Sequence, residues 1–517
     1  MNYKIRSIRF FYLLTASLMF LVQQQSMAQL GHISARNMAL GGGGTAYMDG
    51  YHANFVNPAN LMLNYDKRTN LEIGLLGGIS ASAGGTLANI SVYNEFFTND
   101  LVLRGQTADD ALNGLFGSGN SKLKNVGLNA DVIPLGIRIQ RPKWSFSAAG
   151  RSRILSNFGF NRGVGKLLLK GINSDDFGTT TPVNFSAETF LVSEISVGIA
   201  RQFLDVDLPL LVKNVKIFVG VAPKLLYGMN YNRVDFNSTL QVQETSPGRF
   251  RYLHEFEYNI QATGAPSDQL RDFAAANNPP NETEQFDEFF NPEGDDFSGL
   301  EDVGFGLDLG VTMEIELDNF PILGSKKRPN FLRVGASITD LGSVSFDQSG
   351  SFTNRNVFDW RGVEELDFER IEDEFNDDTG DFLNFVFADS IGNGIYSDFQ
   401  PDNDGKVEAK LPTRLNLGGL LQLGKLGISA DITSSFRDVG FTEDETAFAL
   451  GAEYRLLKFI PIRAGIRTGG VASTVYSVGT GLDFRRLTFT LAVSSTGTDP
   501  DNGSTLGAAW SGLVLRF

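Results

Sequence analysis

Few side chains in this sequence have the chemistry that catalysis or metal binding requires. The 517 residues include no cysteine and only three histidines, His32, His52 and His254. Disulfides and thiolate metal sites are therefore excluded, and any Ser-His-Asp triad or zinc site would depend on these histidines. The glycine-x-serine-x-glycine motif of a nucleophile elbow is missing from the sequence. We therefore expect no enzymatic activity, no cofactor and no bound metal.

A run of four glycines, Gly41 to Gly44, is the other feature with chemical potential. Phosphate-binding loops are rich in glycine, but a Lys-Ser or Lys-Thr pair and a helix follow them. Neither feature follows this run. The run instead indicates a backbone that passes close to a wall or adopts positive φ. Further along, Pro58 is expected to fix a turn and to hold Asn57 in an extended conformation.

The N-terminal residues have a pattern typical of export. Lys4, Arg6 and Arg9 precede an apolar stretch at 10–22, and Ser26-Met27-Ala28 forms a small-x-small cleavage site. The apolar stretch is too short to span a bilayer, so residues 1–28 are predicted to be a cleaved signal peptide. Cleavage would remove these three positive charges from a chain whose formal net charge is already −16. Such an acidic protein is not expected to bind nucleic acid.

Alternation of apolar and polar residues predicts membrane-spanning strands. Over 414–423, Leu415, Leu417 and Leu421 share one face, whereas Asn416 and Gln422 lie on the other. The polar faces of such segments carry charged residues beside glycine, as a lumen would, and their apolar faces carry no charge. A closed barrel also pairs every backbone hydrogen-bonding group, which lipid demands. Similar alternation recurs over 448–455, 462–467, 476–484 and 486–494.

The last strand gives the orientation. Leu513, Leu515 and Phe517 alternate outward, which resembles the signal read by the outer-membrane insertion machinery. With Phe517 at the periplasmic rim, short basic turns alternate with longer, often acidic loops. The sequence therefore predicts an all-β fold, a transmembrane antiparallel β-barrel of about 14 strands in the lipid of a bacterial outer membrane. Large acidic external loops are expected near 243–301 and 348–410, either as solvated segments or as a docking surface.

Residues 34–61 resemble the hatch of the long-chain fatty acid transporter (FadL) superfamily, which includes the PorV-like barrels of Bacteroidetes. Gly43-Gly44 and Asn60 depart from the alanine and glycine that are usual there. The resemblance implies a hatch at 29–69, folded inside a barrel formed by 70–517. The hatch motif consists of Leu40, Gly41, Gly42, Asp49, Asn57, Pro58 and Ala59.

Two functions are compatible with this resemblance. The first is passive transport of hydrophobic small molecules, in which the hatch shifts to open a path. The second is a PorV-like interaction barrel of type IX secretion, whose acidic loops would bind secreted protein cargo. A purely structural barrel is a third alternative. We favour transport, because a hatch that shifts to open a path would explain why a glycine-rich segment obstructs the lumen.

Overall fold

The structure of this protein is a computed structural model. Within the described residues, no helix is both long and apolar enough to cross a membrane. The signal peptide predicted at 1–28 lies outside the described residues. The structure describes residues 33–64, 70–98, 103, 105–119, 121–207, 214–276, 302–317, 330–364, 395–396, 398, 400–401, 406–436, 446–469, 474–484, 486–496 and 503–517.

The predicted barrel is confirmed, and its strand number agrees with the sequence pattern. Within the described part of the chain, 14 strands form a closed antiparallel wall. Closure comes from the first and last of them, where Ile73 pairs with Leu515 and Ala83 pairs with Leu506. The wall consists of β1 (Leu71–Gly85), β2 (Lys124–Gln140), β3 (Trp144–Phe160), β5 (Phe185–Val206), β6 (Asn214–Ser246), β8 (Asp302–Glu316), β9 (Phe331–Phe346), β13 (Arg414–Leu423), β14 (Leu426–Ser435), β15 (Thr446–Arg455), β16 (Pro461–Thr468), β17 (Val475–Asp483), β18 (Leu487–Thr496) and β19 (Ser504–Arg516).

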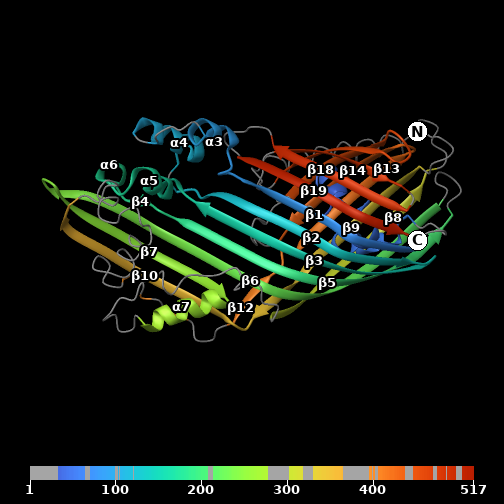
Figure 1. Cartoon of the computed structure of the whole chain (residues 1–517), viewed down its shortest axis with the longest axis horizontal. Coiled ribbons are helices and arrows are strands. Elements are labelled where there is room, and N and C mark those ends of the chain that lie inside the picture. Colours follow the sequence, from blue (N-terminus) through green and yellow to red (C-terminus); the bar gives the residue numbers. More distant parts are fainter. Residues whose placement is uncertain are drawn as a thin grey trace, which may run out of the picture.

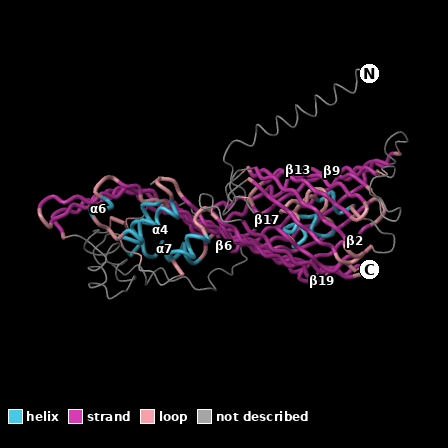
Figure 2. Tube along the Cα trace, turned by 90° about the horizontal axis from the view of Figure 1, so that it is seen from above, coloured by secondary structure: helices cyan, strands magenta, loops and turns pink. Residues whose placement is uncertain are grey.

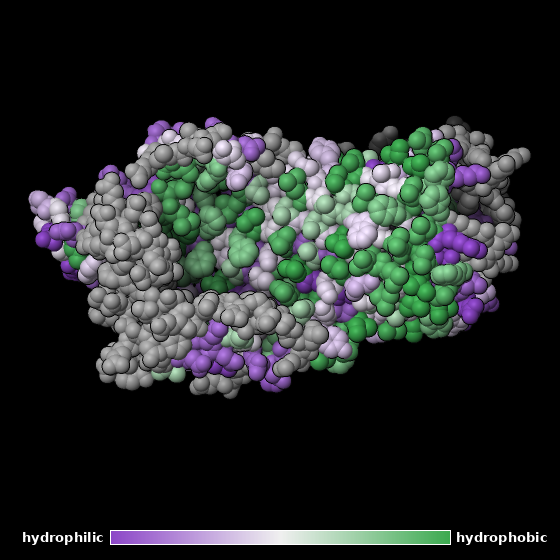
Figure 3. Space-filling model, in the orientation of Figure 1, coloured by the Kyte–Doolittle hydropathy of each residue, from purple (hydrophilic) through white to green (hydrophobic). Residues whose placement is uncertain are grey.

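Side chains of the wall alternate between an apolar exterior and a polar lumen. Tyr476 and Leu513 are 58% and 50% exposed on the outside. Ser477, which follows Tyr476, and Arg463 on β16 are buried in the interior. Figure 3 shows hydrophobic residues over most of the barrel surface on the face in view. This distribution is that of a barrel whose outer surface faces lipid.

The barrel continues into a long extension at the end opposite Phe517 (Figure 1). Strand β6, with 33 residues, runs from the barrel wall far into it. The extension also contains β7 (Arg249–Thr263), which pairs with β6, and β10 (Ser349–Val363), which pairs with β7. Its smaller elements are α3 (Ile90–Phe96), α4 (Gln106–Phe116), α5 (Arg162–Lys170), α6 (Ser174–Phe177), α7 (Ala265–Ala276) and the short strands β4 (Thr181–Pro182), β11 (Gln400–Pro401) and β12 (Val407–Lys410).

The extension corrects the expectation of large loops near 243–301 and 348–410. Strand β7 and helix α7 occupy 249–276, and β10 occupies 349–363. The even-numbered side chains of β7, such as Tyr252 and Phe256, are buried, while odd-numbered ones such as Glu255 face solvent. The sequence of β7 therefore contains the alternation of a strand. The charged residues on its outer face gave the segment the composition of an acidic loop. The acidic run 282–296 and most of the acidic stretch after Glu364 lie outside the described residues.

The N-terminal segment, residues 33–64, is folded inside the barrel (Figure 2). It consists of three short helical turns, α2 (Ala35–Ala39), η2 (Gly50–Phe55) and η3 (Pro58–Met62). Helix α2 contacts strands β16 to β19, whereas η3 contacts β5, β6 and β8 on the other side of the wall. Nearly all of these residues are buried. A chain segment therefore crosses the lumen from one wall to the other, in a barrel too wide for its wall side chains alone to fill.

Candidate functional site

The glycine run follows α2 and lies directly against the barrel wall. Gly41 and Gly42 have φ values of +88° and +91°, which residues with a side chain rarely adopt. A Cβ atom on Gly41 would also lie 2.8 Å from the backbone oxygen of Ile466. Leu40, which ends α2, is buried. Both reasons proposed for the glycines, positive φ and close approach to the wall, therefore apply at Gly41.

Asp431 on β14 holds the end of the glycine run. Its Oδ1 atom accepts hydrogen bonds from the backbone N–H groups of Gly44 at 3.0 Å and Thr45 at 2.9 Å. Gly418 on the neighbouring strand β13 leaves the space that this carboxylate occupies, since a Cβ there would lie 2.3 Å from Oδ1. A charged lumen residue thus satisfies two buried donors of a segment without regular secondary structure.

Asn57 fastens the second half of the N-terminal segment. Its side-chain amide donates to the backbone oxygen of Thr45 at 2.8 Å and to the hydroxyl of Thr312 on β8 at 2.9 Å. Its Oδ1 accepts from the N–H of Ala59 at 3.2 Å, which caps η3. Pro58 occupies the first turn, where no N–H is needed, and Asn57 is extended, as predicted.

Asp49 belongs to an ion-paired group on the side of the segment that faces the Phe517 rim. The Arg36 guanidinium lies 3.4 Å from its carboxylate and also donates to the backbone oxygen of Tyr47. Burial opposes ionisation of Asp49, but the guanidinium groups of Arg36, Arg516 and Arg138 outweigh it and lower the pKa of the carboxyl to about 2. Asp49 is therefore charged at any physiological pH and ties the segment to the wall electrostatically.

A layer of buried ion pairs lies on the side of the segment that faces the barrel mouth and the extension. The ammonium group of Lys224 on β6 lies 2.8 Å from both Asp308 and Asp340 and 3.2 Å from Glu194. Its Nζ is also 5.6 Å from the centre of the Phe55 ring in η2, in a cation–π contact. The remaining members of the layer are Asp131, Arg151, Arg153 and Arg414. Opposite charges balance, which burial requires.

Apolar side chains fill the barrel mouth beyond this layer. Strand β6 passes through each zone in turn, from Lys224 in the ion-paired layer to Leu226 and then to Leu240 in the extension. The mouth cluster consists of Leu155, Phe190, Val192, Leu226, Tyr231, Val344, Phe346, Val407, Ala409 and Leu411. The extension cluster contains Phe177, Val183, Leu240, Val242, Phe250, Tyr252, Phe256, Tyr258, Ala262, Leu270, Phe273, Phe352, Phe358 and Tyr396.

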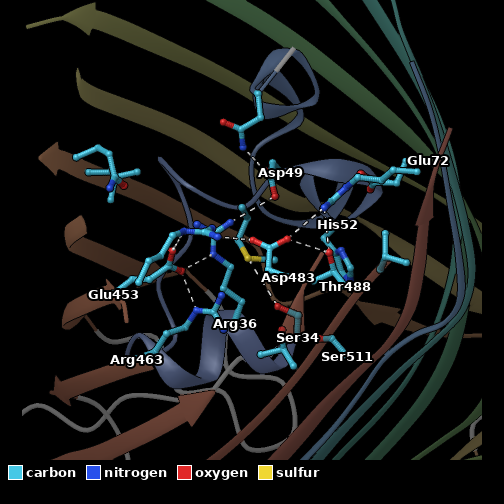
Figure 4. Close-up of a pocket in the computed structure, with 18 of the residues that line it drawn as sticks. Ser34, Arg36, Asp49, His52, Glu72, Glu453, Arg463, Asp483, Thr488 and Ser511 are labelled. Carbon is cyan, nitrogen blue, oxygen red and sulfur yellow. Dashed lines mark hydrogen bonds and ion pairs between the residues drawn. The ribbon is translucent and has the colours of Figure 1, made fainter. Parts of the chain in front are cut away.

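A polar cavity of about 430 Å³ lies on the side of the N-terminal segment that faces the Phe517 rim. The segment contributes Ser34, Arg36, Met48, Asp49, His52 and Asn64 to its lining, and the other lining residues belong to the wall. Figure 4 shows Arg36 and Arg463 converging on Glu453 at one side of this cavity.

The two histidines within the described residues lie far apart in the sequence and have separate roles. His52 in η2 lies 3.0 Å from the backbone oxygen of Gly77 on β1. His254 on β7 lies 2.8 Å from the Tyr396 hydroxyl in the extension. Within the described part of the chain, no group of three or more His, Cys, Asp and Glu side chains is arranged to hold a metal ion.

A protein family model matches residues 58–495, most of the chain. Its description is "Family of unknown function (DUF5723)". The chain belongs to this family. A comparison with curated proteins gave no match.

Several solved structures are similar to this member of DUF5723. The P. putida toluene transporter TodX is 12% identical, with 95% of this chain and 99% of that chain covered and a TM-score of 0.41. The CymD monoaromatic hydrocarbon channel is 11% identical, with 95% and 99% covered and a TM-score of 0.44. A Pseudomonas aeruginosa FadL homologue is 10% identical, with 96% and 99% covered and a TM-score of 0.37. At this degree of similarity, these names do not assign a ligand to the DUF5723 chain.

The residues singled out in the sequence of this DUF5723 protein fall into two places. The motif from Leu40 to Ala59 lies in the lumen as one segment. Leu513 and Phe517 lie on the outer surface of β19 or just after it, where the Phe517 backbone oxygen accepts from the N–H of Asn70 at 2.8 Å. Sequence reasoning missed Asp431 and Lys224. Each stands in a strand at a lumen-facing position, but nothing in the sequence indicates which partner it meets.

Proposed function

We propose that this protein is a passive outer-membrane transporter of hydrophobic small molecules, with residues 33–64 acting as the hatch. The observation that carries the proposal is the succession of two apolar clusters along β6, one in the extension and one in the barrel mouth. In this reading, apolar molecules collect on the aromatic inner face of the extension and then partition into the mouth cluster. Burying apolar surface drives both steps without an energy source.

The aromatic face is suited to this role because its side chains point inward from the extension sheet. Phe256 stacks on Tyr396 with ring centres 4.7 Å apart, and Phe358 lies 5.8 Å from the same ring. Figure 3 shows a hollow over the extension with hydrophobic residues in it. Apolar pockets with a few polar groups are the usual binding sites of small hydrophobic ligands.

The ion-paired layer and the hatch would then control passage to the other side. A hydrophobic molecule does not cross a layer of paired charges such as Lys224 and Asp340 without disturbing it. Because Lys224 also contacts Phe55 of the hatch, the hatch must move before the molecule is released. Glycine-rich backbone at 41–44, held by hydrogen bonds to Asp431, is a connection that can be broken and re-formed. Secreted protein cargo remains the alternative function, with the extension as its docking surface.

Uptake of radiolabelled naphthalene by intact cells tests the proposal. We expect several-fold faster uptake in cells with the barrel than in cells without it. Phe358→Ser, on the inner face of β10, should remove most of this gain. Val357→Ser, on the adjacent outward-facing position that is 50% exposed, is the matched control and should leave uptake unchanged.

A third variant separates binding from folding. Phe358→Leu keeps an apolar side chain, so it should retain most of the uptake if Phe358 acts through its hydrophobic surface. Equal uptake with and without the barrel, together with a secreted protein that co-purifies in one-to-one ratio, would overturn transport in favour of cargo binding.

A further inference from the structure

The polar cavity at the Phe517 rim is built for a ligand of a different kind. It measures about 430 Å³, far more than the roughly 10–15 Å³ that one water molecule needs. Its lining extends from the N-terminal segment to wall residues at strand ends of the rim, including Leu71, Asp483 and Arg516. The cavity therefore lies next to the barrel end that we assign to the periplasm.

Positive charge predominates in the lining. Six guanidinium groups and four carboxylates line the cavity. Arg333 is paired with Glu314, outside the lining, at 2.6 Å, which leaves five guanidinium groups for four carboxylates. Glu453 lies within 3.5 Å of Arg36, 3.2 Å of Arg455 and 2.8 Å of Arg463. The lining arginines are Arg36, Arg138, Arg333, Arg455, Arg463 and Arg516, and the carboxylates are Asp49, Glu72, Glu453 and Asp483.

The other two shared carboxylates show the same shortage of negative charge. Glu72 lies 3.4 Å from Arg138 and 3.2 Å from Arg516. Asp483 lies 2.6 Å from Arg455 and 3.6 Å from Arg516. Because each guanidinium carries five N–H donors, carboxylates that are shared in this way leave donors without an ionic partner.

Arg463 supplies a specific donor. Its side chain is only 3% exposed, and its Nε donates to Glu453 at 2.8 Å. Among the residues that the structure describes, its Nη1 atom is buried without a hydrogen-bond partner. A buried guanidinium N–H without an acceptor is costly, whereas a bound oxyanion would supply two or more acceptor oxygens.

We propose that this cavity is a binding site for a small oxyanion, a phosphate or carboxylate group, held by Arg463 together with Arg36 and Arg516. The ligand enters from the Phe517 rim and lies under the N-terminal segment. Since Arg36 belongs to that segment and Arg463 to β16, the anion also links the segment to the wall. This site does not rest on the proposed transport of hydrophobic molecules, and a barrel of any function could have it.

Binding of inorganic phosphate to the full-length purified barrel, measured by isothermal titration calorimetry, tests the site. Arg463→Gln removes the charge while Glu453 keeps Arg36 and Arg455, and it should weaken phosphate binding about tenfold or more. The matched control is Arg467→Gln, because Arg467 lies four residues along the same strand, is also buried and faces the lumen outside the cavity lining. Its Nε likewise has no hydrogen-bond partner among the described residues, so the two variants differ in their place relative to the cavity. It should bind phosphate as the parent does. Circular dichroism melting of both variants checks that the barrel is folded.

A second arm identifies the source of the oxyanion. Native mass spectrometry of the barrel from nanodiscs of phosphatidylglycerol and phosphatidylcholine would detect a retained anionic lipid. Saturable binding of free phosphate assigns a soluble ligand, and retention of phosphatidylglycerol that Arg463→Gln abolishes assigns a lipid headgroup. Either supports the site. The absence of both, or equal binding by the parent, Arg463→Gln and Arg467→Gln, would overturn it and leave a cavity filled by water.

Discussion

The backbone N–H of Thr45 donates to the carboxylate of Asp431 at 2.9 Å, across 386 residues of sequence. The same oxygen accepts from Gly44. One side chain of β14 thus holds the N-terminal segment at the end of its glycine run. Because two buried donors depend on it, this contact determines how firmly the segment is held.

Removal of the Asp431 carboxylate should loosen the N-terminal segment. Asp431→Ala leaves the N–H groups of Gly44 and Thr45 without an acceptor, which should lower the free energy of unfolding by about 1–3 kcal/mol. Chemical unfolding in lipid vesicles measures the loss. Asp431→Asn keeps an acceptor oxygen and should be milder. If both variants are as stable as the parent, the contact does not anchor the segment.

Lys224 is predicted to be essential to the buried ion-paired layer. Lys224→Met removes the cation that faces Asp308, Asp340 and Glu194, and should destabilise the barrel by about 3–5 kcal/mol. The additional change Asp308→Asn removes one unpaired charge and should recover part of the loss. Unfolding curves of the two variants test this, with the exposed Lys425→Met as the control. A double variant that is less stable than Lys224→Met would contradict the prediction.

The contact between His254 and Tyr396 should make the extension sensitive to acid. Burial lowers the pKa of His254 from 6.5 to about 4. The folded extension therefore favours the neutral imidazole. Its contribution to stability is complete above pH 6.5 and is lost as the pH falls towards 4. Fluorescence of Trp360, which packs beside this cluster, should change over that range.

His254→Gln is the matched variant for the acid response. Glutamine keeps a polar group near Tyr396 but does not titrate, so the change in fluorescence between pH 6.5 and 4 should shrink or vanish. A response of the same size in the variant would assign the acid sensitivity to other groups.

The orientation of the barrel is testable because the chain contains no cysteine. Ser246→Cys places a thiol at the end of β6 in the extension, and Lys425→Cys places one in the turn between β13 and β14 at the Phe517 rim. A membrane-impermeant maleimide should label position 246 in intact cells and position 425 only after permeabilisation. The reverse pattern would invert the topology.

The wall of the barrel was predictable because its signal is local. Successive side chains of a strand point to opposite faces, so Leu417 and Asn416 reveal a lipid face and a lumen face without knowledge of their neighbours. The strand predicted at 414–423 is found with those bounds. The glycines at 41 and 42 were predictable for a similar reason, since positive φ is a property of the single residue.

The contacts across the lumen were decided only by the tertiary structure. Which wall residue meets Thr45, or which carboxylates surround Lys224, depends on closure of β1 against β19 and on the stagger of all the strands between them. The extension also depended on such contacts, because the aromatic face of β7 and β10 is identifiable as an interior only once β6 lies beside β7. Sequence periodicity specifies which way a side chain points, and the fold alone specifies what lies opposite it.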